Sequence, residues 1–289
     1  MTAVKKLDIG GALYDFEDIK LSEKTYQKLA DRMYDLAGVD LPFTPKNHAL
    51  IRNRIVKLLR RHQLSTYEEY WNLIEKGGAQ VINEFISALT TNMTSFYRES
   101  NHFDFLKEVL PQLFVKYPTE LRMWCAAAST GQEPYTIAMT ACEGLSEAQV
   151  SKTRILATDI DLQVLKKGSI GTYEEREMQG LPPTHRHKYF EKHKVGTDEI
   201  WRTKDHLHKM IRFAPFNLMS PKYEFQNKFH VIFCRNVLIY FDEATTKKVI
   251  DNLVECLASG GYLILGHSES GNVKHPHLKP LSRAVYQKV

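Results

Sequence analysis

Residues 121–139, LRMWCAAASTGQEPYTIAM, join an apolar run to a helix-like run through a loop of small residues. The run LRMWC predicts a strand, and the residues from Tyr135 onward predict a helix. Many α/β folds bind a nucleotide at such a loop, because small side chains let the backbone approach the ligand closely. Gly131 can adopt a turn conformation that is closed to other residues. The loop alone indicates tight strand-to-helix packing as readily as it indicates a ligand site.

The rest of the chain after residue 121 repeats this alternation. Short apolar runs rich in β-branched and aromatic residues occur at 154–160 (RILATDI), 211–216 (IRFAPF), 230–234 (HVIFC) and 261–266 (GYLILG). Helix-like stretches such as 134–143 and 243–258 lie between them, which predicts a parallel sheet with helices on both faces. Residues 171–210 interrupt the rhythm and are expected to form an inserted β-subdomain. The final run, AVYQKV, is expected to add an edge strand.

The first third of the chain reads as helical. Ser22 is a predicted N-cap and Gly38 a predicted helix end. Ile51, Ile55, Leu58 and Leu59 recur at helical spacing in a second helix. Ser65 and Glu68 match a capping box at the start of a third helix, which Gly77 and Gly78 end, and AQVINEFISALTT predicts a fourth. No strand is predicted before Leu121. We therefore expect a helical domain at 1–90, a linker and first helix at 91–120, and an α/β domain at 121–289.

Composition describes an ordinary globular protein. The chain has 289 residues, of which 43% are hydrophobic and 25% charged, with a formal net charge of +5. No apolar run approaches the roughly 20 residues that span a bilayer, and the N-terminus lacks the apolar core of a secretory signal. Four widely spaced cysteines show neither metal-ligand spacing nor a disulfide framework. They are interpreted as buried thiols in a reducing cytoplasm, and no metal is expected.

Acidic residues near the loop narrow the choice of ligand. Asp159 and Asp161 close the second apolar run, and an acid in that place is the expected acceptor for ribose hydroxyls, although it can also cap a helix. A pyrophosphate requires glycine amides and is repelled by a carboxylate such as Glu133. S-adenosylmethionine carries a ribose, an ammonium group and no phosphate. The sequence therefore favours S-adenosylmethionine over a nicotinamide dinucleotide.

A polar segment, TNMTSFYRESNHF (91–103), precedes the sheet and includes Asn92, Thr94 and Arg98. One interpretation is a turn and helix cap before a helix that begins near Glu99, with Arg98 in solvent. The other is a linker folded over the cofactor, in which Arg98 binds a carboxylate. From the residues alone, the first interpretation is favoured.

A second polar pair, Arg235 and Asn236, ends the apolar run in FHVIFCRNVLIYF (229–241). Because the strands are expected to be parallel, this pair should lie at the same edge of the sheet as Glu133 and Asp159. The stretch offers no proline-lined slot of the kind that amino-directed nucleic-acid methyltransferases use. Tyr240 could belong to the core or could direct its hydroxyl into the site.

Taken in order, NMTSFYRESNHF, AAASTGQEPYTIAM, ATDID, FCRNVLIYF and GYLILGHSE resemble the chemotaxis receptor glutamate methyltransferase family, of the CheR type. The resemblance covers about residues 20–289. It implies an all-helical N-terminal domain followed by a class I, Rossmann-like methyltransferase domain with a small inserted antiparallel β-subdomain. Two positions depart from the family pattern: Gln132 replaces an acid and Tyr97 replaces Phe.

The resemblance also implies roles for individual residues. Arg98 and Tyr240 would lie nearest the reacting methyl group. The cofactor contacts would fall on Asn92, Thr94, Arg98, Glu133, Asp159, Asn217, Leu218, Arg235 and Asn236. The reaction would be methyl transfer from S-adenosylmethionine to a glutamate side chain, which is ionised at pH 7 and needs no general base.

The basic helix predicted at residues 46–62 indicates what kind of partner the protein binds. Residues 46–62 contain no acid, and their basic members include Arg52, Arg54, Lys57, Arg60 and Arg61. Such a face is commonly just solvated, but it could also attract an acidic partner over long range. The methylation helices of chemotaxis receptors are rich in glutamate and fit the resemblance, whereas nucleic acid fits the charge equally well. A receptor C-terminal tail could dock on the insertion, although residues 190–205 carry no clear peptide-binding signature.

Three alternatives remain at this point. A nucleic-acid methyltransferase would share the sheet and the cofactor. A non-catalytic regulator would bind S-adenosylmethionine without turnover, which the retained Arg98, Arg235, Asn236 and Tyr240 disfavour. A nicotinamide oxidoreductase is least compatible with Glu133 and the alanines of the loop.

Overall fold

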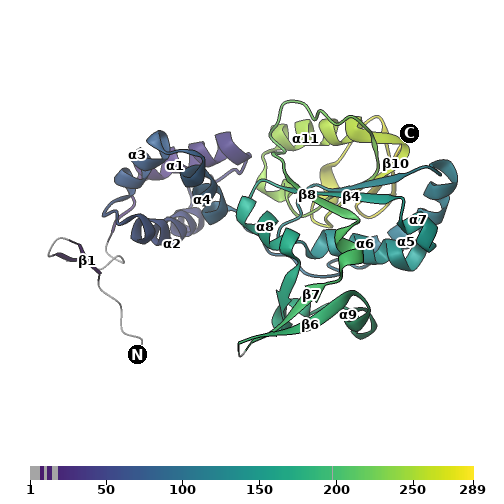
Figure 1. Ribbon diagram of the computed structural model, residues 1–289. Coiled ribbons are helices and arrows are strands. Elements are labelled where there is room, and N and C mark those ends of the chain that lie inside the picture. The colour runs from purple at the N-terminus through teal and green to yellow at the C-terminus, as the bar shows by residue number, and fades with distance from the viewer. Residues whose placement is uncertain (1–6, 10–11, 15–18, 197) are drawn as a thin grey trace. The chain divides into compact units, whose positions relative to one another are not determined.

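The structure is a computed structural model that describes residues 7–9, 12–14, 19–196 and 198–289. The chain divides into two compact units, Met1–Thr91 and Asn92–Val289 (Figure 1). None of the helices in these described ranges is long and apolar enough to cross a bilayer.

The first unit is mainly helical. Its helices are α1 (Glu23–Ala37), α2 (Pro45–His62), α3 (Tyr67–Lys76) and α4 (Ala79–Leu89). A short antiparallel hairpin of β1 (Leu7–Ile9) and β2 (Ala12–Tyr14) precedes them. The expectation of no strand before Leu121 was therefore wrong, because three-residue strands are too short to show a periodic pattern.

Capping chemistry sets the limits of these helices. The Ser22 side chain accepts the backbone N–H of Thr25 at the start of α1, and Gly38 ends the helix in the left-handed region at φ 72°. The capping box of α3 joins Thr66 and Glu69, one residue later than predicted. Both pairs match the same sequence pattern, and the structure uses the pair nearer the first helical turn.

The second unit contains a seven-stranded sheet in the order β11-β12-β10-β9-β3-β4-β8. Its strands are β3 (Leu121–Cys125), β4 (Thr153–Asp159), β8 (Ile211–Pro215), β9 (Phe229–Cys234), β10 (Leu257–Leu265), β11 (Leu278–Ser282) and β12 (Val285–Lys288). The five predicted strands are present and run parallel. The C-terminal run forms β12 but not an edge strand, because β11, which was not predicted, pairs outside it. The strand order reverses between β3 and β9, and ligands bind beside such a switch point.

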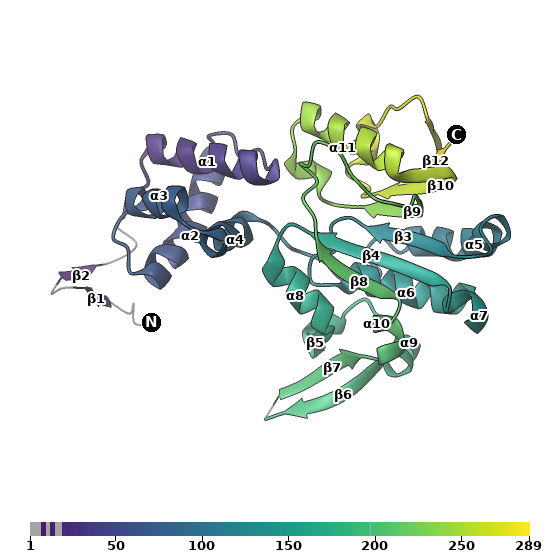
Figure 2. The ribbon, with the colours of Figure 1, turned by 45° about the horizontal axis from the view of Figure 1, so that its top comes forward.

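Helices cover both faces of this sheet (Figure 2). They are α5 (Asn101–Lys116), α6 (Gln132–Gly144), α7 (Glu147–Val150), α8 (Leu162–Ile170) and α11 (Glu243–Cys256). Residues alternate between the two faces along β3: Met123 packs in one core cluster with residues of α5 and α6, whereas Trp124 packs in the other with residues of α11. This alternation is the period-two pattern of a strand that is buried on both sides. The predicted α/β fold class is thus confirmed.

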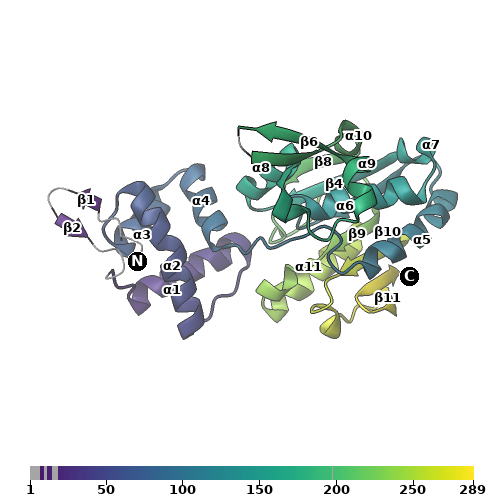
Figure 3. The same ribbon diagram turned by 90° about the horizontal axis from the view of Figure 1, so that it is seen from below.

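The insertion between β4 and β8 forms a small antiparallel sheet in the order β5-β7-β6 (Figure 2), and Figure 3 shows its strand β6 from another side. It comprises β5 (Thr172–Glu174), η1 (Glu175–Met178), α9 (Pro183–Tyr189), β6 (Phe190–Val195), β7 (Asp198–Thr203) and α10 (Asp205–His208). Its buried Phe190 packs edge-to-face on Phe96 of the segment that precedes α5. The insertion is therefore anchored to the second unit through aromatic packing.

Candidate functional site

The loop between β3 and α6 is held in a close turn at the carboxyl edge of the sheet. Ala128 donates its backbone N–H to the carbonyl of Thr158 at 2.8 Å. Gly131 has φ 96°, and a Cβ there would lie 2.8 Å from Gly168 Cα. Only glycine fits this position without a shift, as the sequence predicted. The loop is therefore packed closely against Gly168 of the α/β unit.

Asp159 ends β4 directly beside this loop. Its carboxylate accepts the backbone N–H of Ser129 at 2.8 Å and that of Asp161 at 2.9 Å. Desolvation raises the pKa of the buried Asp159 to about 6. A carboxylate can accept about four hydrogen bonds, so acceptor capacity for a ligand hydroxyl remains.

The segment before α5 is tied to both loops. The Asn92 amide donates to Asp161 Oδ2 at 2.7 Å, while its carbonyl accepts from Ser129 Oγ at 2.9 Å. Asp161 also caps α8 through the backbone N–H of Gln163. Asn92 thus joins the segment before α5 to the loops after β3 and β4 at one edge of the sheet.

Arg235, which follows β9, connects several groups at the carboxyl edge of the sheet. Its fully buried side chain reaches Glu133 at 2.6 Å and Glu99 at 3.2 Å. It also donates to the carbonyl of Arg98 at 2.5 Å and lies over the Phe103 ring. Desolvation opposes ionisation of Glu99, but the Arg235 charge and the hydrogen bonds outweigh it, so that the pKa of Glu99 is lowered. Arg235 therefore fastens the linker to the sheet.

This network changes the interpretation of Glu133. From the sequence, we expected Glu133 to accept hydrogen bonds from the ligand. In the structure, Oε2 pairs with Arg235 and Oε1 accepts from Cys125 Sγ at 3.2 Å. Its charge is therefore already balanced, although it lies beside the loop as predicted.

The loop after β9 is organised by an acid that sequence reasoning missed. The Glu269 carboxylate accepts four backbone N–H groups, at 2.6 to 2.8 Å, from Asn236, Val237, Leu238 and Gly266. Asn236 is in the left-handed region at φ 58°, and its amide donates to Glu99 at 3.3 Å. The acid in GHSE (266–269) is the only local signal for this role. Glu269 holds the loops after β9 and β10 together.

The two residues expected nearest the methyl group are partly exposed. Tyr240 ends η2 (Leu238–Tyr240) and lies outside both core clusters. Arg98 donates to the carbonyl of Met93 at 3.0 Å. Its neighbours Tyr97 and Glu99 have φ values of 53° and 55°, which non-glycine residues seldom adopt. Such backbone strain is typical of functional segments.

The remaining predicted contacts divide between site and core. Thr94 lies in the same linker and is partly exposed. Asn217 follows β8, and its side chain accepts the backbone N–H of Met219 at 2.9 Å. Leu218 is buried in the core cluster that contains Trp124. Its backbone can border the site, but its side chain packs inward.

In the first unit, α2 buries its apolar residues and exposes most of its basic residues. Ile51, Ile55, Leu58 and Leu59 are buried, as predicted. Arg52, Lys57, Arg60 and Arg61 are exposed. Arg54 is different, because its guanidinium donates to the carbonyl oxygens of Leu89 and Thr90 at 3.0 and 2.7 Å. It satisfies the C-terminal end of α4 and has a structural role whatever else it does.

Comparisons with known proteins cover both units. Residues 92–286 match the family model described as CheR methyltransferase, SAM binding domain, and residues 24–90 match CheR methyltransferase, all-alpha domain. A chemotaxis protein methyltransferase of Borreliella burgdorferi is 38% identical over 281 residues, covering 94% of this chain and 96% of the relative. One of Escherichia coli is 35% identical over 255 residues, covering 88% and 87%. Chemotaxis protein methyltransferase 2 of Pseudomonas aeruginosa is 31% identical, covering 94% of each chain.

Proposed function

Because this chain belongs to the CheR methyltransferase family, we propose that it transfers the methyl group of S-adenosylmethionine to glutamate side chains of chemotaxis receptors, forming methyl esters. One structural observation carries the proposal. The loops after β3, β4 and β9 and the segment 92–100 are joined by hydrogen bonds at the carboxyl edge of one sheet. This is where a doubly wound sheet binds its ligand.

The residues present fit an adenosine ligand that lacks phosphate. Asp159 is a buried acceptor suited to ribose hydroxyls, and Gly131 lets the loop turn tightly against Gly168. Arg235 carries one positive charge and is already paired with two carboxylates, so it is not free to bind a phosphate. When bound, S-adenosylmethionine supplies an electrophilic methyl group on a sulfonium.

The chemistry asks little of the protein beyond positioning. A glutamate carboxylate has a reference pKa of about 4.3 and is already nucleophilic at pH 7, so no general base is required. The reaction needs no Lewis acid, because the leaving group departs as a neutral thioether. Arg98 and Tyr240 are the partly exposed polar groups that can orient the incoming carboxylate. The protein contributes alignment and exclusion of water.

The product distinguishes this proposal from its rivals. Incubation with radiolabelled S-adenosylmethionine and receptor-containing membranes should label the receptor, and the label should be released as methanol by mild base. An ester behaves in this way, whereas a methylated amine or nucleobase does not. Label on RNA, or none on receptor, would contradict the proposal. The names of the relatives disfavour the nucleic-acid alternative.

We further propose that the exposed cations of α2 attract the acidic methylation helices. Lys57 and Arg60 are three residues apart and share one side of the helix. Reversing both to glutamate should raise the KM for receptor severalfold and leave cofactor affinity unchanged. Arg54 is left intact, because its loss would also expose the end of α4.

The control has the same change in net charge. Lys24→Glu with Lys76→Glu alters exposed residues of α1 and α3 in the same unit. Added salt should weaken methylation by the parent and by this control more than by the α2 variant, because screening acts within a Debye length of about 8 Å at 0.15 M. Equal KM values for the two double variants would show that α2 is only a solvated face.

A receptor tail is a second candidate partner. Strand β6 is an edge of the inserted sheet, and residues 191–194 are exposed. Such an edge can accept an extended peptide as an additional strand. Its exposed residues carry no apolar pocket, so we expect no tight tethering. Titration with a fluorescent tail peptide checks this, and saturable binding at low micromolar concentration would contradict it.

The four free thiols suit the expected cytoplasmic setting.

A further inference from the structure

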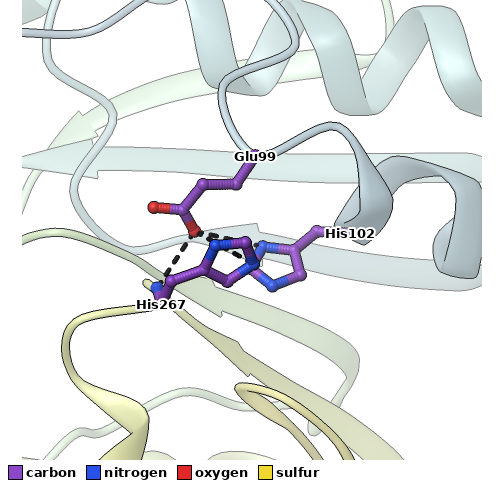
Figure 4. Close-up of side chains that lie close together, drawn as sticks. All are labelled: Glu99, His102 and His267. Atoms are coloured by element: carbon purple, nitrogen blue, oxygen red, sulfur yellow. Dashed lines mark hydrogen bonds and ion pairs between the residues drawn. The ribbon is translucent and has the colours of Figure 1, made fainter.

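Three potential metal ligands meet beside Arg235 although they are distant in sequence. Glu99 precedes α5, His102 lies in its first turn, and His267 follows β10 (Figure 4). One donor atom from each lies within 4.8 Å of the others. His102 Nδ1 is 3.6 Å and His267 Nε2 is 3.9 Å from the same oxygen, Glu99 Oε2.

The imidazoles of this cluster lack ordinary hydrogen-bond partners. Both ring nitrogens of the fully buried His102, and Nε2 of His267, have none among the described residues. The Arg283 backbone lies near His102 without reaching hydrogen-bond geometry. Buried polar atoms are nearly always satisfied by protein, water or an ion. Three such nitrogens around one carboxylate therefore form a donor set suited to an ion.

The donor set and spacing suit a zinc-class ion. Zinc bonds of about 2.0–2.2 Å in a tetrahedral arrangement separate neighbouring ligand atoms by about 3.3–3.5 Å. The separations of 3.6 and 3.9 Å from the imidazole nitrogens to Glu99 Oε2 need to shorten by a few tenths of an ångström, and the two nitrogens, which lie within 4.8 Å of each other, need to approach by up to about 1.4 Å. The two imidazoles are ligands of intermediate softness, so this set with one hard carboxylate favours zinc, cobalt or copper over magnesium or calcium. The His267 side chain is partly exposed, although its Nε2 atom is buried.

We propose that Glu99, His102 and His267 form a binding site for a zinc-class divalent cation, and that this ion competes with Arg235 for Glu99. Arg235 Nη2 lies 3.2 Å from the oxygen that would bind the metal. Two cations on one carboxylate oxygen repel each other, so the bound ion weakens this ion pair. Arg235 then keeps Glu133 but loses one of its two carboxylates, and its hold on the Arg98 carbonyl loosens.

Cobalt absorption tests binding without relying on the proposed function. The full chain is titrated with cobalt(II) chloride, and the visible absorption of four-coordinate cobalt is recorded. The parent should saturate at about one equivalent, whereas His267→Gln and Glu99→Gln should each bind at least tenfold more weakly. His193→Gln is the matched control, because His193 also lies beside a carboxylate, 3.7 Å from Glu191, but outside the cluster. Circular dichroism confirms that each variant is folded.

Three outcomes would overturn the site. They are no saturable band in the parent, an unchanged band in both ligand variants, and an equal loss in the His193 control. Competition with Arg235 has a separate test in the methylation assay. Zinc should lower turnover of the parent and the control severalfold relative to the chelator-treated enzyme, and should lower turnover of His267→Gln much less. Equal inhibition of all three proteins would refute the competition.

Discussion

Lowering the pH from 7 to 5 should weaken binding of S-adenosylhomocysteine about tenfold, because Asp159 loses its charge in this range. Burial raises the pKa of this carboxyl to about 6. Its ionised fraction is then about nine-tenths at pH 7 and about one-tenth at pH 5. Ribose hydroxyls need an acceptor, so the ionised form is the one that binds. Affinity should rise through pH 6 and level off above pH 7.

The same shift affects stability with the opposite sign. The folded pKa of Asp159 lies above its ordinary value of 3.8, so its contribution favours folding below that value and disappears as the pH rises through about 6. The amount is about 3 kcal/mol at 1.36 kcal/mol for each pKa unit. The apo protein therefore carries a strained carboxylate at pH 7, and ligand hydroxyls relieve part of that strain.

Calorimetry at several pH values measures both the affinity and the protons released on binding. On binding, the parent should release about half a proton at pH 6, rising toward one proton at pH 5, seen as a dependence of the heat on the buffer. Asp159→Asn should bind about 1–3 kcal/mol more weakly at pH 7, since its NH2 group must face the N–H of either Ser129 or Asp161. It should also lose most of the pH dependence. An unchanged affinity of the parent from pH 7 to 5, or an equal slope in the variant, would refute the role of Asp159.

Three other changes test the network. Arg235→Met should lower the free energy of unfolding by about 3–5 kcal/mol in urea denaturation, because it leaves the buried carboxylates of Glu99 and Glu133 without their cation. Adding Glu133→Gln should restore part of this stability. A loss below about 1 kcal/mol would contradict the observed pairing of Arg235 with both carboxylates. Glu269→Gln should cost about 2 kcal/mol or more and reduce turnover, since an amide cannot accept all four N–H groups; unchanged melting and turnover would show that the loop holds itself. Arg98→Ala should reduce turnover at least tenfold, and it should lower the free energy of unfolding by less than about 1 kcal/mol. Full methylation by this variant would support the other interpretation, in which residues 91–103 form a turn and helix cap with Arg98 in solvent.

Local patterns predicted most of the fold. The five parallel strands, the helices of the first unit and the inserted sheet all follow from periodicity, caps and turn residues. These signals depend on neighbours within a few positions, so one sequence contains them. The errors are also local in origin: β1 and β2 have three residues each, β11 contains Pro280 and buries only Leu278, and the capping box of α3 had two adjacent candidates.

The site was predicted only in part. The loop with Gly131 and the acid Asp159 each follow a predicted strand, and the carboxyl ends of parallel strands meet at one edge. What each side chain contacts there was not predictable. Glu133 was expected to face the ligand, whereas it pairs with Arg235, which lies 102 residues away. Glu269 showed no pattern that distinguishes a loop-organising acid from a solvated one.

By itself, the sequence determined the type of each segment, the small-residue loop, and the acid that follows the second strand of the sheet. Tertiary structure alone decided which charges neutralise one another at the carboxyl edge. Arg235 joins Glu99 and Glu133, and His267 meets Glu99 from 168 residues away. The physical reason is one of range: helix and strand periods fix directions within a segment, whereas ion pairing requires a few ångströms between segments, and only the packed sheet sets that distance.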